Sequence, residues 1–247
     1  MLKMSFTLVT GFIDRTRYDP GAPKRPVEFY LEHGKALLAL PVPKVVFMEE
    51  HIQELLKDAL AVAPTTHVVT TTKEAMEYWP LRPRMLVCPL PPGANPEKDT
   101  HDYFILMLNK LQWCCQAAEA NPWGTETFVW MDFGINYLLK TMPLQEAVTK
   151  TQWDVQLGKI RIPGCWPLYY PISYPTALCW HFCGTLFAGD KTALTRAQVL
   201  QKVVVDQLLE NGMATWEVTV WSHIAQLDPT LYDWYPADHN DLLFSRF

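Results

Sequence analysis

Short runs of β-branched and aromatic residues alternate with longer segments whose apolar residues recur every three or four positions. This alternation limits the possible folds more than any other feature of the sequence. Strands separated by such helices are joined by crossovers and pair in parallel. The expected strands are Ser5–Ile13, Lys44–Met48, Thr66–Thr71 and Thr127–Met131, and the expected helices between them are Val27–Leu40, Glu49–Val62 and His101–Ala120. The sequence therefore predicts an α/β fold with a mostly parallel central sheet flanked by helices.

The second half of the chain has a different character. Arg161–Pro175 contains four prolines and four large aromatic residues. Proline at this density interrupts helices and central strands, so we expect an irregular segment. Its rings either line a binding cleft or pack on the domain. A strand (Phe182–Phe187), a helix (Thr192–Asn211), a second helix from Thr215 and an aromatic, polar tail (Asp233–Phe247) should follow.

Charge and cysteine content narrow the functional classes. The formal net charge is −5 and the basic residues do not cluster, which argues against nucleic acid as a partner. No apolar run has the length of a membrane span, and Met1–Asp14 is interpreted as a first strand because it lacks the small-residue cleavage site of a signal peptide. The six cysteines include the adjacent Cys114 and Cys115, so we expect reduced thiols and a cytoplasmic location.

Common nucleotide and nucleophile motifs are absent from the sequence. There is no phosphate-binding Gly-x-x-x-x-Gly-Lys loop, no Gly-x-Gly-x-x-Gly fingerprint and no Gly-x-Ser-x-Gly elbow. Cys179, His181 and Cys183 would share one face of a strand, but zinc sites usually have two separated ligand pairs. The pattern favours buried structural cysteines over a zinc site.

The most informative segment is the apolar run Thr127–Met131, which leads directly into Asp132 and then, two residues later, Gly134. In open parallel sheets, ligands bind at the carboxyl ends of the strands, which is where this carboxylate would lie. A divalent ion bound to a diphosphate needs only one or two protein carboxylates. Asp132 is therefore a candidate for metal or substrate contact, and the alternative is a helix cap without a role in function.

Several motifs, in order, resemble the nucleotide-sugar glycosyltransferases of GT-A fold. The first is Leu108–Trp113, followed by a helix and by Phe128–Asp132. The sequence of Trp130–Ile135 more specifically resembles the bacterial HtrL/YibB-like family. Thr7–Gly11 is similar to the strand that receives the nucleoside, Cys183–Gly189 to the small-residue strand behind the donor sugar, and Asp238–Asn240 to the segment with a late metal-binding histidine.

This resemblance implies a GT-A-like single domain over residues 1–247, with a nucleotide-binding half at about 1–135 and an acceptor half at about 136–247. It implies a hexosyl- or pentosyltransferase that moves a sugar from a UDP- or GDP-sugar donor to a glycan or glycolipid acceptor, as in polysaccharide biosynthesis. Manganese or magnesium would bridge the diphosphate. The enzyme would act in the bacterial cytoplasm, or in the host cytoplasm if the protein is viral.

The resemblance also assigns roles to residues. The catalytic candidates are Asp132 and Glu217, the metal candidates are Asp132 and His239, and the donor-binding candidates are Thr10, Gly11, Phe12, Arg15, Lys110, Gly134 and Gly184, with Arg25 as a further candidate for phosphate contact. Gly134 stands where the family has a second carboxylate. The ion would then be held by Asp132, His239 and the diphosphate, or Asp132 would contact the sugar without a metal.

Structural explanations compete with these roles. Glu217 follows the possible helix cap Thr215, and a glutamate in a first helical turn is favoured by the helix dipole alone. Trp221, Trp234 and Tyr235 either stack on an acceptor sugar or pack in the core. Two other functions stay open at this point: a non-catalytic nucleotide- or carbohydrate-binding module on the same fold, and an unrelated α/β hydrolase or phosphatase that acts through Asp132.

Overall fold

The computed structural model describes residues 6–19, 25–95, 98–172 and 177–247. Its strands are β1 (Phe6–Phe12), β2 (Lys44–Met48), β3 (Thr66–Thr70), β4 (Thr127–Met131), β5 (Ile160–Gly164), β6 (Leu186–Asp190) and β7 (Tyr232–Pro236). Its α-helices are α1 (Val27–Leu38), α2 (Glu50–Leu55), α3 (Lys57–Val62), α4 (Arg82–Leu86), α5 (His101–Ala120), α6 (Leu144–Lys150), α7 (Lys191–Glu210) and α8 (Glu217–Leu227). The 3₁₀ helices are η1 (Arg15–Arg17), η2 (Lys73–Ala75), η3 (Trp79–Leu81), η4 (Ile135–Leu138) and η5 (Asp241–Phe244).

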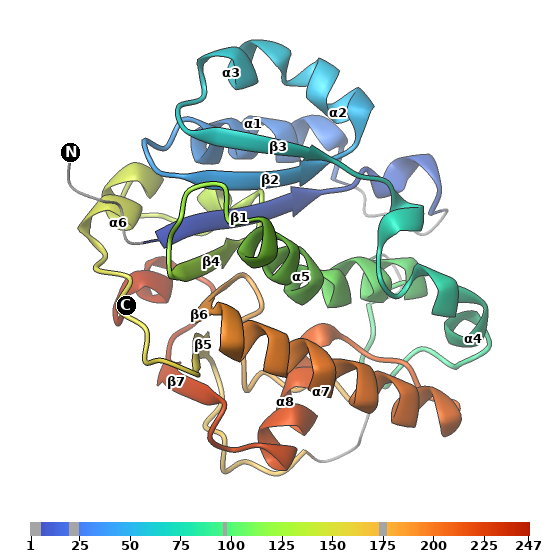
Figure 1. Cartoon of the computed structure of the whole chain (residues 1–247). Helices are drawn as coiled ribbons and strands as arrows, with labels where there is room; N and C mark the ends of the chain where they lie inside the picture. The colour runs from blue at the N-terminus through green and yellow to red at the C-terminus, as the bar shows by residue number, and fades with distance from the viewer. Residues whose placement is uncertain (1–5, 20–24, 96–97, 173–176) are drawn as a thin grey trace.

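Within the described residues the strands form one seven-stranded sheet in the order β3-β2-β1-β4-β6-β5-β7 (Figure 1). Strands β1 to β4 pair in parallel, β6 runs antiparallel to both of its neighbours, and β5 pairs with β7 in parallel. The predicted α/β fold with a mostly parallel sheet is confirmed. From β1 the chain builds outward to β2 and β3 on one side and to β4 on the other. The topological switch point, where ligands bind in open α/β sheets, therefore lies between β1 and β4.

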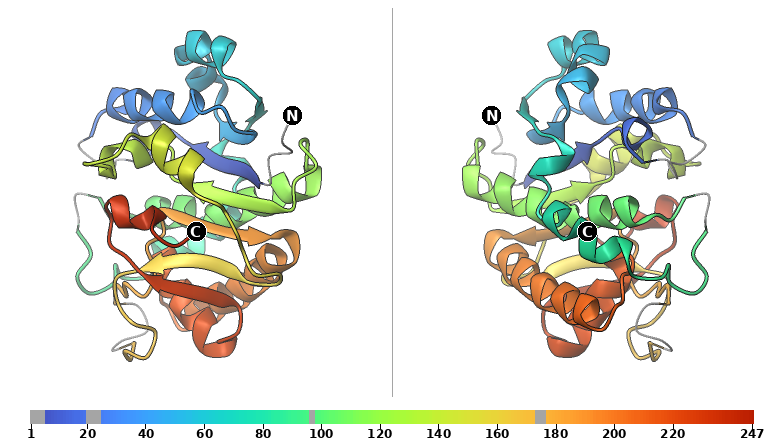
Figure 2. Two further views of the ribbon diagram at one scale, coloured as in Figure 1. Left: turned by 90° about the vertical axis from the view of Figure 1, so that its left-hand side faces the viewer. Right: turned by 90° about the vertical axis from the view of Figure 1, so that its right-hand side faces the viewer.

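Helices cover both faces of the sheet (Figures 1 and 2). Alternate residues of the central strands point to opposite faces, as the two-residue period of a strand requires. Val9 and Trp130 pack in the core beneath α5, α7 and α8, whereas Leu8 and Val129 pack in the core on the other side, toward α1 and α6. The uninterrupted apolar run of β4 is thus explained by burial on both faces.

The structure corrects the predicted helix over Glu49–Val62. The segment forms two short helices, α2 and α3, with Leu56 between them at φ −107° and ψ 9°. Leu56 is buried in the core next to Leu38 and Ile52, so the bend directs an apolar side chain inward. The predicted helix over His101–Ala120 is confirmed at both ends, where Thr100 accepts a hydrogen bond from the Tyr103 amide and Asn121 adopts the left-handed conformation.

Strand β5 was not expected, because it contains Pro163. The Pro163 carbonyl accepts a hydrogen bond from the Cys183 amide at 2.7 Å, and a residue's N and O point to the same side of a strand. The Pro163 nitrogen, which carries no hydrogen, therefore points toward the β6 side of β5. Because β6 pairs only with Ile160 and Arg161, no β6 residue needs a hydrogen bond from Pro163. The sheet loses no ladder hydrogen bond at this proline.

The predicted strand Phe182–Phe187 is displaced toward the C-terminus. Pairing with β4 begins at Leu186, opposite Met131, the last residue of β4. Residues 182–185 have no strand to pair with there, and the Thr185 carbonyl instead accepts the Asp132 amide at 2.9 Å. This segment consequently lies across the carboxyl end of β4. The predicted tail Asp233–Phe247 contains most of β7 and all of η5.

A pH effect on stability is expected from Lys44, the first residue of β2. Its ammonium is fully buried and donates to the carbonyls of Leu40 and Pro64 at 2.7 Å each, and burial lowers its pKa to about 8 from 10.5. A folded-state pKa below the unfolded one means that stability is lost as the pH falls toward 8. The free energy of unfolding of the wild type, relative to Lys44→Met, should rise by about 2.5 kcal/mol between about pH 7 and pH 10. Urea titrations at several pH values measure this difference, and a pH-independent difference would contradict it.

Candidate functional site

A cavity of about 500 Å³ opens at the switch point of the sheet. It is bounded by the carboxyl end of β1, by the end of β4 with the following turn, and by one face of α5. Its lining includes Gly11, Phe12, Asp14, Arg15, Arg25, Tyr30, Lys98, Tyr103, Lys110, Trp130, Asp132, Gly134, Tyr137 and Thr185. A concave site of this size in this position is where a small-molecule ligand is expected to bind.

Lys110 lies at the centre of the polar groups of this site. Its ammonium is 3.0 Å from Asp132 Oδ1 and 3.0 Å from Glu217 Oε1, and it donates to the Gly184 carbonyl oxygen at 2.9 Å. The Trp130 indole N–H donates to the same Asp132 oxygen at 2.8 Å. Four parts of the chain therefore meet at one buried cation: α5, the end of β4, the segment before β6 and the first turn of α8.

The two carboxylates around Lys110 have different access to the cavity. The Asp132 side chain is 34% exposed and lines the cavity, whereas that of Glu217 is 7% exposed and does not. Burial alone would lower the pKa of Lys110, but the charges of Asp132 and Glu217 outweigh it and raise that pKa. Lys110 is therefore an ammonium at neutral pH, and Asp132 is the carboxylate that a ligand can reach.

Gly184 permits this arrangement by having no side chain. A Cβ at this position would lie 2.5 Å from Glu217 Oε1, well inside the van der Waals distance. Gly184 is not among the residues that line the cavity, so its role in donor binding stays a prediction, and the contacts described here position Lys110 and Glu217. Its carbonyl holds Lys110, and its missing side chain leaves room for Glu217.

Gly184→Ala is expected to push the Glu217 carboxylate away from Lys110 and to lower the free energy of unfolding by about 1–3 kcal/mol. Gly134→Ala is the matched control, because a Cβ there meets only ordinary contacts, 3.5 Å from Tyr30 and 3.7 Å from Tyr137. Urea denaturation of both variants measures the difference. Equal stability losses in the two variants would contradict the steric argument.

Arg15 lines the cavity as predicted but is already held by protein groups. Its guanidinium pairs with Asp19 at 2.6 Å, donates to Thr100 Oγ1 at 2.9 Å and lies 4.7 Å above the centre of the Tyr103 ring. The Lys98 ammonium lies 5.2 Å from the same ring. Tyr103 thus presents an aromatic wall with two cations near it, and Arg15 is fixed in orientation.

The structure brings together only part of the predicted site. Gly11, Phe12, Arg15, Lys110, Asp132, Gly134 and Arg25 all line the cavity, and Thr10, Gly184, Glu217 and His239 do not. Thr10 is fully buried within β1, whereas Gly11 and Phe12, the last two residues of that strand, line the cavity. Gly11 is required there, since a Cβ would lie 2.4 Å from the Trp113 ring.

His239 lies in a different cluster, with Cys165 and Cys183. The two sulfur atoms are 3.4 Å apart, and Cys165 Sγ is 4.0 Å from His239 Nδ1. Hydrogen bonds from Cys183 and then His239 lower the pKa of Cys165 to about 6. Cys179 and Cys183 are buried, as the sequence interpretation favoured; residues 179–183 form no strand, and Cys183 lies beside Cys165.

The aromatic residues proposed for acceptor stacking are mostly core residues. Trp221 is 1% exposed and donates to Gln201, and Tyr235 is 3% exposed and donates to the Leu243 carbonyl. Trp234 is half-buried and donates to the His181 carbonyl. The packing interpretation is therefore confirmed for Trp221 and Tyr235.

Sequence reasoning missed several cavity residues, among them Asp14, Tyr30, Lys98, Tyr103, Tyr137 and Thr185. One signal was available for Tyr103: it precedes Lys110 by two helical turns and so shares its face of α5. Thr185 could not be found, because it was assigned to the interior of a strand.

Among the described residues that line the cavity, no three potential metal ligands converge. Asp14 and Asp132 are the two carboxylates among the described lining residues, and Asp14 Oδ1 accepts hydrogen bonds from the Thr16 amide and hydroxyl. The Lys110 ammonium, 3.0 Å from Asp132, opposes a dication on that carboxylate. Within the described chain, the single group of three or more potential metal ligands is Cys165, Cys183 and His239, outside the cavity.

Comparison with known proteins identifies the fold. No model of a protein family matches the sequence, and no curated protein sequence matches it. Among solved structures, mouse xyloside xylosyltransferase 1 in its apo form matches with a TM-score of 0.52 and 13% identity, over 93% of this chain and 84% of that one. The 4-diphosphocytidyl-2C-methyl-D-erythritol synthase of Anaerococcus prevotii DSM 20548 has a TM-score of 0.44 and 10% identity, over 94% and 87% of the chains. The likeness to the xylosyltransferase confirms the predicted GT-A-like fold, whereas membership of the HtrL/YibB-like family stays a prediction.

Proposed function

We propose that the protein transfers a sugar from a nucleotide-diphosphate donor to a glycan or glycolipid acceptor. The observation that carries this proposal is the position of Lys110 and Asp132 in the cavity between β1 and β4. The fold is shared with a mouse enzyme whose name states that it transfers xylose to a xyloside. Sequence identity to that enzyme is only 13%, so the donor class is argued from the site itself and the acceptor class from the family resemblance.

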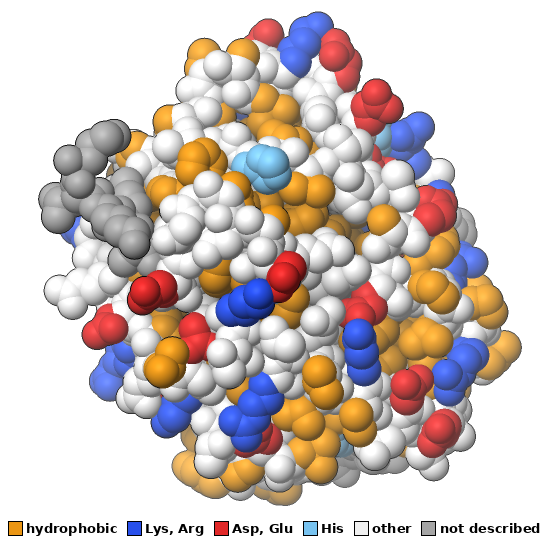
Figure 3. Space-filling view, viewed as in Figure 1, with side chains coloured by type: hydrophobic (Ala, Val, Ile, Leu, Met, Phe, Trp, Pro, Cys, Tyr) orange, Lys and Arg blue, Asp and Glu red, His pale blue; other side chains and the backbone are white. Residues whose placement is uncertain are grey.

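The charge of the cavity suits an anionic donor. Arg15, Arg25, Lys98 and Lys110 line it, against the carboxylates of Asp14 and Asp132. The whole chain carries a net charge of −5, so the four cations are concentrated at this site, where Arg15 also pairs with Asp19 and Lys110 with Asp132 and Glu217. On the described part of the face drawn in Figure 3, acidic and basic side chains are interspersed without a continuous basic surface. A small anion such as a diphosphate fits a confined site with these cations better than an extended polyanion does.

The aromatic side of the cavity suits the nucleoside. Phe12 is half-buried, with its ring centre 5.4 Å from that of Phe133 and 5.5 Å from that of Tyr30. We propose that the base packs against Phe12, with Gly11 beside it.

Glycosyl transfer breaks the bond between the anomeric carbon and a diphosphate oxygen. Negative charge develops on the departing oxygen while the sugar ring gains oxocarbenium character. In our proposal the fixed Lys110 ammonium stabilises the diphosphate, and the exposed oxygen of Asp132 contacts the sugar. Glu217 acts through Lys110 as a positioning residue. A manganese or magnesium ion, if the donor brings one, would add Lewis-acid stabilisation of the leaving group.

Release of nucleoside diphosphate from UDP-, GDP- and TDP-sugars, with and without manganese, tests this function. Turnover with one nucleotide family would support the transferase, and activity that persists in EDTA would assign the cationic role to Lys110. Binding without release would instead identify a non-catalytic module. Hydrolysis of a generic phosphoester without turnover of any nucleotide sugar would replace the proposal with a hydrolase or phosphatase.

A further inference from the structure

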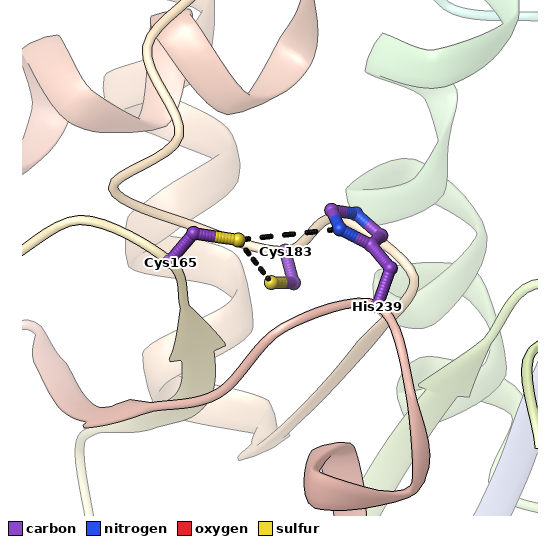
Figure 4. Close-up of side chains that lie close together, drawn as sticks. All are labelled: Cys165, Cys183 and His239. Atoms are coloured by element: carbon purple, nitrogen blue, oxygen red, sulfur yellow. Dashed lines mark hydrogen bonds between the residues drawn. The ribbon is translucent and has the colours of Figure 1, made fainter.

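Cys165, Cys183 and His239 come from three separate parts of the chain and converge at one point (Figure 4). Cys165 follows the last residue of β5, Cys183 lies before β6, and His239 follows β7. One possible ligand atom from each lies within 4.8 Å of the other two. Figure 4 shows the two sulfur atoms and the imidazole facing a common centre.

The distances approach those of a tetrahedral zinc site. Zinc–sulfur bonds of about 2.3 Å and zinc–nitrogen bonds of about 2.0 Å place ligand atoms roughly 3.5–3.8 Å apart. The sulfur–sulfur distance is 3.4 Å and the distance from Cys165 Sγ to His239 Nδ1 is 4.0 Å. The distance between Cys183 Sγ and the His239 ring nitrogen is at most 4.8 Å, so movements of up to about 1 Å would complete the geometry. Two thiols and one imidazole form a donor set that selects zinc over magnesium or manganese.

A fourth ligand is available beside the three. Asp238 Oδ1 lies 3.5 Å from Cys165 Sγ and 3.3 Å from His239 Nδ1. The Asp238 side chain is largely exposed and can move. Either this carboxylate or a water molecule can therefore complete a four-coordinate ion.

Backbone contacts hold the three segments in place. The Cys183 amide donates to Pro163, the Cys165 amide to Trp180 and the Ala237 amide to Gly164. Gly164 allows this close approach, because a Cβ there would lie 1.7 Å from the His181 carbonyl oxygen. The ligand positions are thus fixed by hydrogen bonds before any ion binds.

We propose that Cys165, Cys183 and His239 bind a structural zinc ion, with Asp238 or water as the fourth ligand. The ion would tie together the ends of β5 and β7 and the segment before β6. Gly184, which holds Lys110, follows Cys183 directly, so the ion would also fix one wall of the site. This inference stands independently of the proposed function, and it gives His239 a partner set different from the one predicted with Asp132.

The metal content of the purified protein, kept under reducing conditions, tests the proposal. After equilibration with zinc and removal of free metal, we expect about one zinc per chain in the wild type, and less than about 0.2 in Cys165→Ser and in His239→Ala. Cys115→Ser is the matched control, since Cys115 is a half-buried thiol outside the cluster, and it should keep the ion. Circular dichroism establishes that each variant is folded.

Cobalt gives a second readout that does not depend on activity. Cobalt-loaded wild type should show sulfur-to-metal charge-transfer absorption, and this band should be lost in Cys165→Ser but kept in Cys115→Ser. A folded, fully reduced wild type that retains no zinc and shows no such band would overturn the proposal. A native disulfide between Cys165 and Cys183, found by mass spectrometry, would overturn it as well.

Discussion

Lys110→Met is expected to abolish donor turnover and to lower the free energy of unfolding by about 3–5 kcal/mol. The variant removes the cation that lies 3.0 Å from both Asp132 and Glu217. Glu217 would then be a buried carboxylate without its counter-ion, and the Gly184 carbonyl would lose its donor. Urea denaturation measures the stability, and nucleoside diphosphate release measures the turnover.

A double variant separates these two effects. Lys110→Met with Glu217→Gln removes the buried charge together with its counter-ion, so we expect it to regain a substantial part of the lost stability. It should remain inactive, because the donor would still lack the fixed cation. Active Lys110→Met protein would contradict the assigned role of Lys110. A double variant as unstable as the single one would contradict the buried-pair argument.

Asp132→Asn is expected to reduce turnover by about 100-fold or more while leaving the fold intact. Asparagine has the same shape, and its amide oxygen can still accept from the Trp130 indole, which donates to Asp132 at 2.8 Å. The negative charge that we propose to face the sugar is lost, whereas Lys110 keeps Glu217 as a counter-ion. Steady-state kinetics measure the loss, and thermal denaturation establishes that the variant is folded.

Asp233→Asn is the matched control for this prediction. Asp233 is also a half-buried aspartate on a strand of the same sheet and pairs with Arg161 at 3.4 Å, but it does not line the cavity. Its turnover should stay within about threefold of the wild-type value, since the loss of a partly exposed charge rarely disturbs a distant site. A fall in turnover as large as that of Asp132→Asn would mean that loss of a carboxylate anywhere in the sheet disturbs activity, which would remove the case for Asp132.

The sequence identifies the site only where local pattern and topology suffice. Asp132 could be placed because an apolar run without alternation indicates a central strand, and the end of such a strand is a ligand position. Lys110 was selected only through the family resemblance. Its contact with Glu217 joins residues 107 positions apart, and no local pattern encodes it. The same holds for Gly184, whose role depends on how closely α8 approaches it.

The sequence predicts the fold well where apolar residues recur at a regular period. It predicts the fold less well where the pairing of strands determines where an element begins or ends. The boundaries of α5 follow from a cap at each end, and its helical period is clear. The start of β6 depends instead on where β4 ends, because a strand continues only while it has a partner. His239 shows the same limit, since its neighbours are set by the packing of three distant segments and not by its own sequence context.

Binding of a nucleotide sugar to the cavity is the central claim, and a thermal-shift comparison of wild type and Lys110→Met/Glu217→Gln tests it most directly. UDP-, GDP- and TDP-sugars are each added with and without manganese. A donor at 100 times its dissociation constant adds about 2.7 kcal/mol, or roughly 5–10 °C for a chain of this length. We predict such a shift with one nucleotide family in the wild type and almost none in the variant. No shift with any donor, or equal shifts in both proteins, would contradict a donor site built around Lys110.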